Sequence, residues 1–335
     1  MKIFSRKILS HGFDDVVSVE NLLEAWRKFL AGKREKRDVQ EFQIRLMDNI
    51  LSLHADLKSG RYRHGGYEHF KISDPKPRDI HKASVRDRLL HHAIYRQLYP
   101  FFDRTFIADS FSCRDNKGTH AAMDRFKKFA FQVSRNNTRQ CWILKCDIRK
   151  FFANIDHRIL MEILTERIKE KKLQWLLREI ITSFTTDGKS AVGLPLGNLT
   201  SQLLVNIYMN EFDQFVKHSI KAKYYIRYAD DFVFLSPNRE WLEIILPEIS
   251  NFLQNRLKLE LHPKKVSVAT LSSGIDFLGW VHFPDHRVLR TATKRRMVRR
   301  IGENPTPETI ASYRGMLSHG NTFRIKEDFL PDFEI

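Results

Sequence analysis

The chain has 335 residues, 42% of them hydrophobic and 12% aromatic, which suits two or three folded units and excludes a globally disordered protein. Its 57 lysines and arginines against 40 aspartates and glutamates leave a net charge of +17. This charge favours nucleic acid as a partner over an anionic membrane, the alternative being charge that serves only solubility. No apolar run could span a bilayer and the first residues lack a secretory leader, so we expect a cytoplasmic protein with no membrane partner.

The N-terminal third is expected to be mainly helical. Apolar residues at helical spacing predict one helix over 22–30 and a second over 38–60, together a helical hairpin. Residues 67–80 predict two strands around a turn, because two prolines in this segment exclude a helix. A helix over 84–99 follows, and Pro100 is expected to end it.

The rest of the chain alternates strands and helices. Strands are expected at 142–148, 224–228, 232–235, 266–269, 277–283 and 288–289, and helices at 156–172, 198–215, 240–257 and beyond 290. Asp156 is interpreted as the cap of its helix rather than as a metal ligand. This order suits an α+β fold in which an antiparallel sheet is backed by helices.

Three aspartates lie where predicted strands end. Asp147 closes the strand at 142–148, and Asp230 and Asp231 lie at the turn of the hairpin that follows. Aspartate favours turns for local reasons, so the pair alone is a weak signal. Three carboxylates at adjacent strand ends, however, repel one another unless a cation compensates them, and hard oxygen ligands suit Mg²⁺ in phosphoryl transfer. No phosphate-binding glycine loop and no His-Glu-x-x-His motif offers another chemistry.

The segments around these aspartates resemble reverse transcriptases. Tyr-Ala-Asp-Asp at 228–231 resembles the Tyr-x-Asp-Asp box of that family, and residues 145–157 resemble the first catalytic-aspartate motif of its bacterial, group II intron-like members. Other segments that match in family order are 74–78, 110–114, 257–265 and 274–279. The resemblance extends from about residue 19 to residue 325, and several ordered motifs at compatible spacing make it specific.

The resemblance implies a right-hand polymerase. Its parts would be N-terminal helices and fingers with some of the palm at 1–140, the palm at 141–285 and the thumb at 286–335. The implied activity is RNA-directed DNA synthesis from deoxynucleoside triphosphates. Two Mg²⁺ ions, for which Mn²⁺ can substitute, would be held by Asp147, Asp230 and Asp231, with the carbonyl of Ile148 as a further ligand.

Four residues resemble nucleotide-binding positions of the family. Lys76 and Arg78 would hold the triphosphate, although Lys76 suits a template-phosphate contact equally well. Phe152 matches the aromatic residue that excludes a ribose 2′-hydroxyl, its alternative being ordinary core packing. Leu196 stands where most relatives have glutamine. The surrounding segment, 194–202, looks most like the reverse transcriptases of diversity-generating retroelements.

An aliphatic residue at position 196 cannot make the hydrogen bonds of a glutamine. We therefore expect looser nucleotide discrimination, in keeping with the mutagenic copying of template adenines that this resemblance implies. The same resemblance implies a dedicated template RNA, the cDNA made from it, and a basic accessory protein oligomer as partners.

Basic residues crowd the C-terminal region, where helical offsets of three and four place several on one face. Those expected to follow a nucleic-acid backbone are Arg287, Arg290, Lys294, Arg295 and Arg299. The alternative is a solvated helix face.

Two other functions stay open. One is an antiviral-defence reverse transcriptase acting on a noncoding RNA, which the palm motifs alone cannot separate from a retroelement enzyme. The other is an RNA-binding or splicing protein with a vestigial polymerase site, which the presence of all three aspartates disfavours. The sequence leaves the template RNA, the priming mechanism, the accessory protein and the oligomeric state undetermined.

Overall fold

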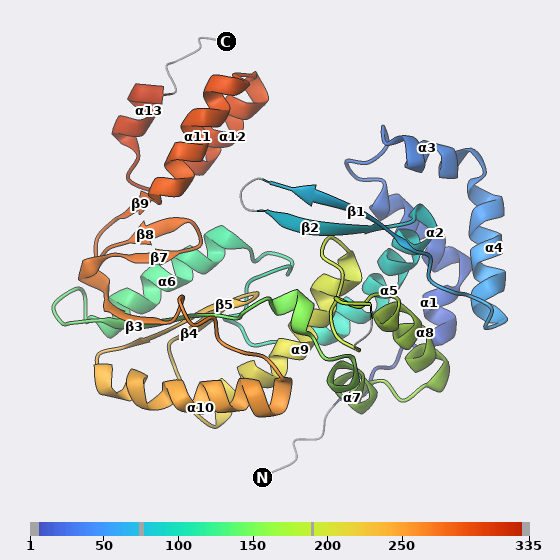
Figure 1. Ribbon diagram of the computed structural model, residues 1–335, viewed down its shortest axis with the longest axis horizontal. Coiled ribbons are helices and arrows are strands. Elements are labelled where there is room, and N and C mark those ends of the chain that lie inside the picture. Colours follow the sequence, from blue (N-terminus) through green and yellow to red (C-terminus); the bar gives the residue numbers. More distant parts are fainter. Residues whose placement is uncertain (1–6, 74–76, 189–190, 330–335) are drawn as a thin grey trace. The chain divides into compact units, whose positions relative to one another are not determined.

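The computed structural model of the protein describes residues 7–73, 77–188 and 191–329 (Figure 1). The chain forms two compact units. The first comprises the described residues of Met1–Ile107, Arg149–Phe215 and Asn251–Glu260, and the second those of Ala108–Ile148, Val216–Ser250 and Leu261–Ile335. None of the helices in the described ranges is both long and apolar enough to cross a membrane.

The first unit is mainly helical. Its elements are α1 (Phe13–Val17), α2 (Val19–Phe29), α3 (Arg37–Ile44), α4 (Leu46–Lys58), the antiparallel pair β1 (Tyr67–Ile72) and β2 (Arg78–Ala83), α5 (Val85–Asp103), η1 (Phe151–Asn154), α7 (His157–Arg167), α8 (Lys171–Thr182) and most of α9 (Leu199–His218). The expected strand pair at 67–80 is confirmed. Asp156 also caps α7 as predicted, because its side chain accepts a hydrogen bond of 3.0 Å from the Ile159 amide.

Three predicted helices have different bounds in the structure. The helix expected over 38–60 is two helices, because the backbone of Arg45 leaves the helical region at φ −118° and ψ 42°. The helix expected over 156–172 is divided between α7 and α8, because Ile168 is extended. Pro100 does not end α5, since a proline in the last turn removes only one backbone hydrogen bond and Phe102, beyond it, is buried.

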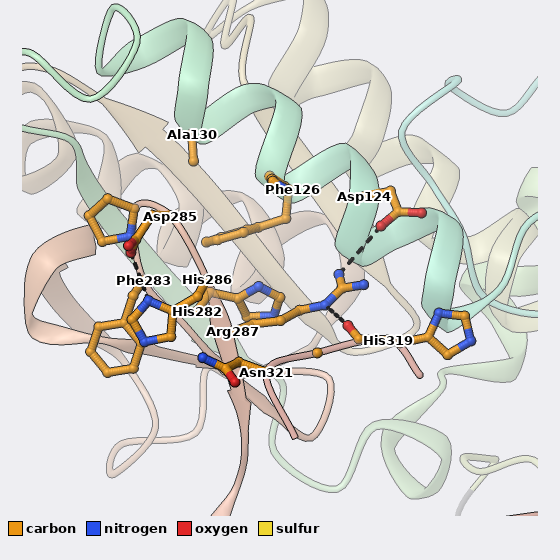
Figure 2. Close-up of a pocket in the computed structure, with 13 residues that line it drawn as sticks. Asp124, Phe126, Ala130, His282, Phe283, Asp285, His286, Arg287, His319 and Asn321 are labelled. Carbon is orange, nitrogen blue, oxygen red and sulfur yellow. Dashed lines mark hydrogen bonds and ion pairs between the residues drawn. The ribbon is translucent and has the colours of Figure 1, made fainter. Parts of the chain in front are cut away.

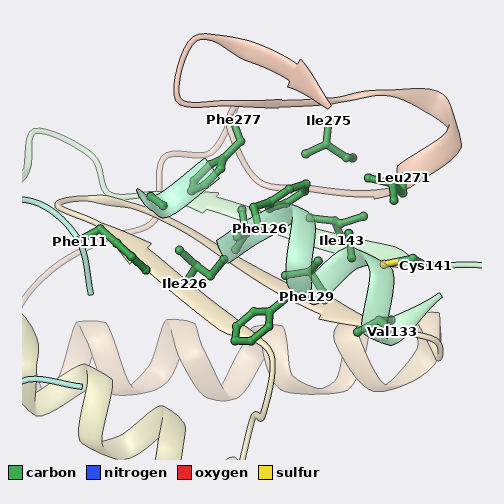
Figure 3. Packing of buried hydrophobic residues seen from close by; sticks show 14 residues of the cluster. Phe111, Phe126, Phe129, Val133, Cys141, Ile143, Ile226, Leu271, Ile275 and Phe277 are labelled. Atoms are coloured by element: carbon green, nitrogen blue, oxygen red, sulfur yellow. The ribbon is translucent and has the colours of Figure 1, made fainter. Parts of the chain in front are cut away.

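The second unit contains a four-stranded antiparallel sheet in the order β4-β5-β3-β6. Its strands are β3 (Trp142–Asp147), β4 (Tyr225–Tyr228), β5 (Asp231–Ser236) and β6 (Ser267–Thr270). Helix α6 (Thr119–Val133) covers one face through a cluster of buried side chains that includes Phe126, Phe129, Ile143, Ile226 and Val233 (Figure 3). Helix α10 (Arg239–Leu257) runs along the other face (Figures 1 and 3). The predicted antiparallel sheet backed by helices is therefore confirmed.

A smaller sheet and three helices complete the second unit. The elements are η2 (Leu271–Ser273), β7 (Ile275–Phe277), β8 (Trp280–His282), β9 (Arg287–Leu289), α11 (Thr291–Glu303), α12 (Pro307–Leu317) and α13 (Phe323–Phe329). Their buried cluster, which also includes a methionine of α6, consists of Met123, Trp280, Leu289, Met297, Ile310 and Leu317. The single strand expected over 277–283 is instead a hairpin, because Leu278 and Gly279 turn the chain with φ of 53° and 86°.

Candidate active site

The β3–β5 pair brings the predicted carboxylates to one end of the sheet. Asp147 and Asp231 are direct partners in the antiparallel register. The amide of Ile148 donates a hydrogen bond of 3.2 Å to the carbonyl oxygen of Asp230, so that residue lies beside the same strand end. Side chains of directly opposed residues lie close to each other across a sheet. All four residues that the sequence assigned to metal binding therefore meet here.

The turn that presents Asp230 depends on a buried arginine. Ala229 has a left-handed backbone, with φ of 55°. Arg227 is completely buried and donates hydrogen bonds to the carbonyl of Ala229 at 3.1 Å and to the Ser110 hydroxyl at 3.2 Å. This role of Arg227 was not predicted, although a lone charged residue inside an apolar strand signals a buried polar contact.

Asp231 lies in an environment that disfavours its charge. Its Oδ1 atom is buried and has no hydrogen-bond partner within the described part of the chain. Burial raises the pKa of Asp231 to about 7. The positive charge of Lys145 opposes this shift, and other carboxylates add to it, those of Asp147, Asp230 and Asp276. A bound cation would relieve this cost.

Two lysines missing from the predicted site lie beside these carboxylates. Lys265 Nζ contacts both carboxylate oxygens of Asp147, at 2.9 and 3.0 Å. Lys145 Nζ donates a hydrogen bond of 2.5 Å to the carbonyl of Asp276. Sequence signals for both existed. Lys265 ends the matched segment 257–265, and Lys145 lies two residues before Asp147, hence on the same face of the strand.

The donor set fits a hard divalent cation. Within the described ranges, no three His, Cys, Asp or Glu side chains are already gathered closely enough to hold an ion. The oxygen atoms of Asp147 and Asp231 are nevertheless the ligand type that Mg²⁺ prefers. The Oδ1 atom of Asp231, which is buried and has no hydrogen-bond partner among the described residues, is the group best suited to act as such a ligand.

Three of the predicted nucleotide-binding residues belong to the first unit and are linked through its backbone. The Leu194 amide donates to the Phe152 carbonyl at 2.8 Å, and the His81 amide of β2 donates to the Leu196 carbonyl at 3.2 Å. Phe152 and Leu196 are both half-buried, and Arg78, which begins β2, is exposed. Lys76 lies outside the described residues.

The basic residues predicted to follow a nucleic-acid backbone lie partly on α11 (Thr291–Glu303) and partly before it. Arg287 lies in strand β9, so helical spacing does not apply to it. Its side chain is 15% exposed, forms an ion pair of 3.4 Å with Asp124 and donates to the carbonyl of His319. Arg290 pairs with Asp276 at 2.9 Å. The residues on α11 are Lys294, whose ammonium lies over the Phe329 ring, and the exposed Arg295 and Arg299.

A separate pocket in the second unit offers a weaker candidate site. Its volume is about 270 Å³, and it lies between α6, the β8–β9 turn and residues 319–321 (Figure 2). The dashed contacts in Figure 2 join Arg287 to Asp124 and to the carbonyl of His319, and His286 to Asp285, so these side chains of the pocket already have partners within it. The carboxylates at the end of β3 and β5 are the stronger candidate.

An antiparallel sheet that presents an Asp-Asp turn beside a strand-terminal aspartate, with helices behind it, defines the palm of a right-hand polymerase. The model of the family described as "Reverse transcriptase (RNA-dependent DNA polymerase)" matches residues 71–282. The chain therefore belongs to the reverse transcriptase family.

Two curated relatives match about three quarters of the chain. Protein YkfC of Escherichia coli is 27% identical over 302 residues, covering 78% of this chain and 77% of that protein. The group II intron-encoded protein LtrA of Lactococcus lactis is 24% identical over 318 residues, covering 74% of this chain and 51% of LtrA. The chain thus spans about three quarters of YkfC and about half of LtrA.

Telomerase structures share the fold. The telomerase of Candida albicans, solved with a fragment of telomeric RNA, has a TM-score of 0.51 at 13% identity and covers 78% of this chain and 54% of that one. Apo telomerase of Candida tropicalis truncated from its C-terminal domain has a TM-score of 0.50 at 15% identity and covers 73% of this chain and 60% of that one.

Proposed function

We propose that this protein synthesises cDNA on a dedicated template RNA, with frequent errors at template adenines, as part of a diversity-generating retroelement. The register that pairs Asp147 with Asp231 supports the polymerase activity, because two carboxylates in direct opposition suit a divalent cation shared between them. The proposed partners are the template RNA, the cDNA and a basic accessory protein oligomer.

In this proposal the carboxylates of Asp147, Asp230 and Asp231, with the carbonyl of Ile148, hold two Mg²⁺ ions, for which Mn²⁺ can substitute. Bound ions would stabilise the negative charge that develops on the attacking primer oxygen and on the departing pyrophosphate. The buried Oδ1 atom of Asp231, which lacks a hydrogen-bond partner within the described residues, supports its assignment as a ligand.

The nucleotide would be held by the residues that resemble nucleotide-binding positions of the family. A guanidinium suits bidentate contact with phosphate, so we assign Arg78, with Lys76, to the triphosphate. Phe152 would exclude a ribose 2′-hydroxyl by steric clash. The Phe152 carbonyl accepts a hydrogen bond from the Leu194 amide, which fixes the backbone that carries the ring and is compatible with this role.

The aliphatic side chain of Leu196 is the feature that favours a mutagenic enzyme. Its carbonyl is bound to the His81 amide, so the residue is anchored to β2 while its side chain offers no hydrogen-bond donor or acceptor. A binding site that lacks such a polar contact discriminates less strongly between correct and incorrect nucleotides. The proposed thumb contacts with nucleic acid are assigned to Arg295 and Arg299, with Lys294, Arg290 and Arg287 contributing less.

A second candidate is an RNA-binding or splicing protein with a vestigial polymerase site. The name of LtrA, which describes that relative as group II intron-encoded, supports it. A defence enzyme that copies a noncoding RNA is a third. Neighbouring genes separate these: a template repeat, a variable repeat in a target gene and a small accessory gene indicate the retroelement.

The decisive experiment is primer extension on an RNA template by the Asp230→Ala variant. Extension should fall by at least about 10³-fold, because removing a metal-binding carboxylate removes several kcal/mol of charge stabilisation. Asp285→Ala, at a side chain that is 79% exposed, is the matched control and should retain activity. Polymerisation by Asp230→Ala that persists at the control rate contradicts the assignment, and unchanged RNA binding by both variants shows that folding is intact.

A further inference from the structure

The ammonium group of a lysine forms an ion pair with one carboxylate of the site. Lys265 Nζ lies 2.9 Å from Oδ1 and 3.0 Å from Oδ2 of Asp147, so one ammonium group contacts both oxygens. The Asp147 side chain is only 16% exposed, whereas that of Lys265 is 44% exposed. The carboxylate is therefore largely shielded from water, while the ammonium keeps part of its hydration.

Backbone hydrogen bonds set the position of Lys265. The His262 amide donates to the carbonyl of Asp147 at 2.7 Å, and the Lys265 amide donates to the carbonyl of His262 at 2.9 Å. Leu261 forms an antiparallel bridge with Ile148. The segment 261–265 is thus attached to the end of β3, which keeps the ammonium group beside the carboxylate.

The local charges explain why a cation is needed at this position without metal. Asp147 faces Asp231 across the strand pair, and repulsion between carboxylates is strong where water is excluded. The ammonium of Lys145 is hydrogen-bonded to the carbonyl of Asp276. Lys265 is the lysine whose ammonium contacts both Asp147 oxygens.

We infer that Lys265 is the resident counter-cation of Asp147 in the metal-free protein, and that a divalent metal ion binds this carboxylate only by displacing the ammonium group. The inference rests on the proposed function, which makes Asp147 a metal ligand. A metal ion and an ammonium group on the same two oxygens would repel each other at contact distance. Because Lys265 is partly exposed, the displaced ammonium can enter water. Lys265 is then a positioning residue that sets the metal concentration at which the site fills.

Metal-induced thermal stabilisation of the full chain tests this inference. Mg²⁺, and separately Mn²⁺, is titrated without nucleotide or nucleic acid. The rise in Tm is fitted as stabilisation that grows with RT ln(1 + [metal]/Kd), and the fitted Kd is the midpoint of metal binding. Lys265→Gln should lower the midpoint about fivefold, because a partly exposed competing ion pair is worth about that much. Lys264→Gln is the matched control: it removes the same charge at an adjacent exposed side chain with no ion pair in the described part of the chain, and should shift the midpoint less than about twofold. An unchanged or raised midpoint in Lys265→Gln, or equal shifts in both variants, overturns the inference.

A double-mutant cycle in EDTA examines the ion pair without metal. Lys265→Gln should lower the Tm by about 1–3 °C in the natural protein and change it little in an Asp147→Asn background. Equal effects in both backgrounds overturn the inference. The failure of the proposed function looks different: a metal response that survives Asp147→Asn contradicts the metal site itself, whatever the cycle gives.

Discussion

Asp147 and Asp231 are direct partners in the β3–β5 register, and the Oδ1 atom of Asp231 is buried there without a hydrogen-bond partner among the described residues. The metal-free protein thus holds two carboxylates in a position that costs stability. Sites that bind ions commonly sacrifice stability in this way, because the bound cation later compensates the repulsion.

Asp231→Asn should therefore stabilise the metal-free protein. At pH 8 in EDTA, urea denaturation is expected to show a free energy of unfolding about 1–2 kcal/mol above that of the natural chain, because a buried charge opposite another is removed. The same variant should lose most of its metal-induced rise in Tm. Asp285→Asn, at an exposed side chain, should change neither quantity, and a destabilised Asp231→Asn protein would contradict the repulsion argument.

Leu196→Gln should make the polymerase more accurate. A glutamine restores hydrogen-bonding groups at a residue anchored to β2, and sites with such groups discriminate better. We expect errors opposite template adenine to fall by about tenfold, with smaller changes at the other bases. Sequencing of cDNA made on a defined RNA measures this, with Leu196→Met as the apolar control. If Leu196→Gln and the natural protein copied template adenine with equal fidelity, the proposal that Leu196 makes the enzyme mutagenic would be wrong.

Arg295 and Arg299 should contribute to nucleic-acid binding through charge alone. They lie four residues apart on α11 and are exposed, and Arg299 is 3.9 Å from Glu303. Replacing both with glutamine should reduce the slope of log affinity against log salt by about 1.5, because each phosphate contact contributes about 0.7–0.9. The comparison is Arg158→Gln, an exposed arginine paired with Glu162 at 3.1 Å. An identical slope in the double variant would remove α11 from the interface.

His91 should make the protein acid-sensitive. Its ring is buried, and burial, followed by the charge of His64, lowers the pKa of His91 to about 3. An unfolded histidine titrates near pH 6.5, so between about pH 6.5 and 3 only the unfolded chain takes up this proton. The contribution of His91 to the free energy of unfolding is expected to be fully present above pH 6.5. Below that pH it should fall by about 1.4 kcal/mol per pH unit.

Urea denaturation between pH 4.5 and 7.5 measures that slope. His91→Gln should reduce the slope of the free energy of unfolding against pH by the contribution of one proton, because glutamine does not titrate in this range. His11→Gln, at a side chain that is 53% exposed, is the control and should leave the slope unchanged. Parallel curves for all three proteins would show that His91 is protonated in the folded state.

The family, the candidate carboxylates and the order of most elements were predicted from the amino-acid sequence. These follow from local information: β-forming residues over 142–148, turn-forming aspartates at 230 and 231, and motifs read along the chain. The family and the α+β fold with its antiparallel sheet are confirmed by the matching model and by the structure. The boundaries after residues 140 and 285 and the individual site roles stay predictions.

Contacts between side chains far apart in the sequence became evident only from the packing of the folded chain. Lys265 and Asp147 are 118 positions apart, and nothing local to either predicts their ion pair. Arg227 is buried because segment 109–111 pairs with its strand. Arg287, expected to contact nucleic acid, forms an ion pair with Asp124 on α6 instead. Propensity and periodicity depend on neighbours in the chain, whereas register, burial and charge pairing depend on the packing of elements far apart in sequence.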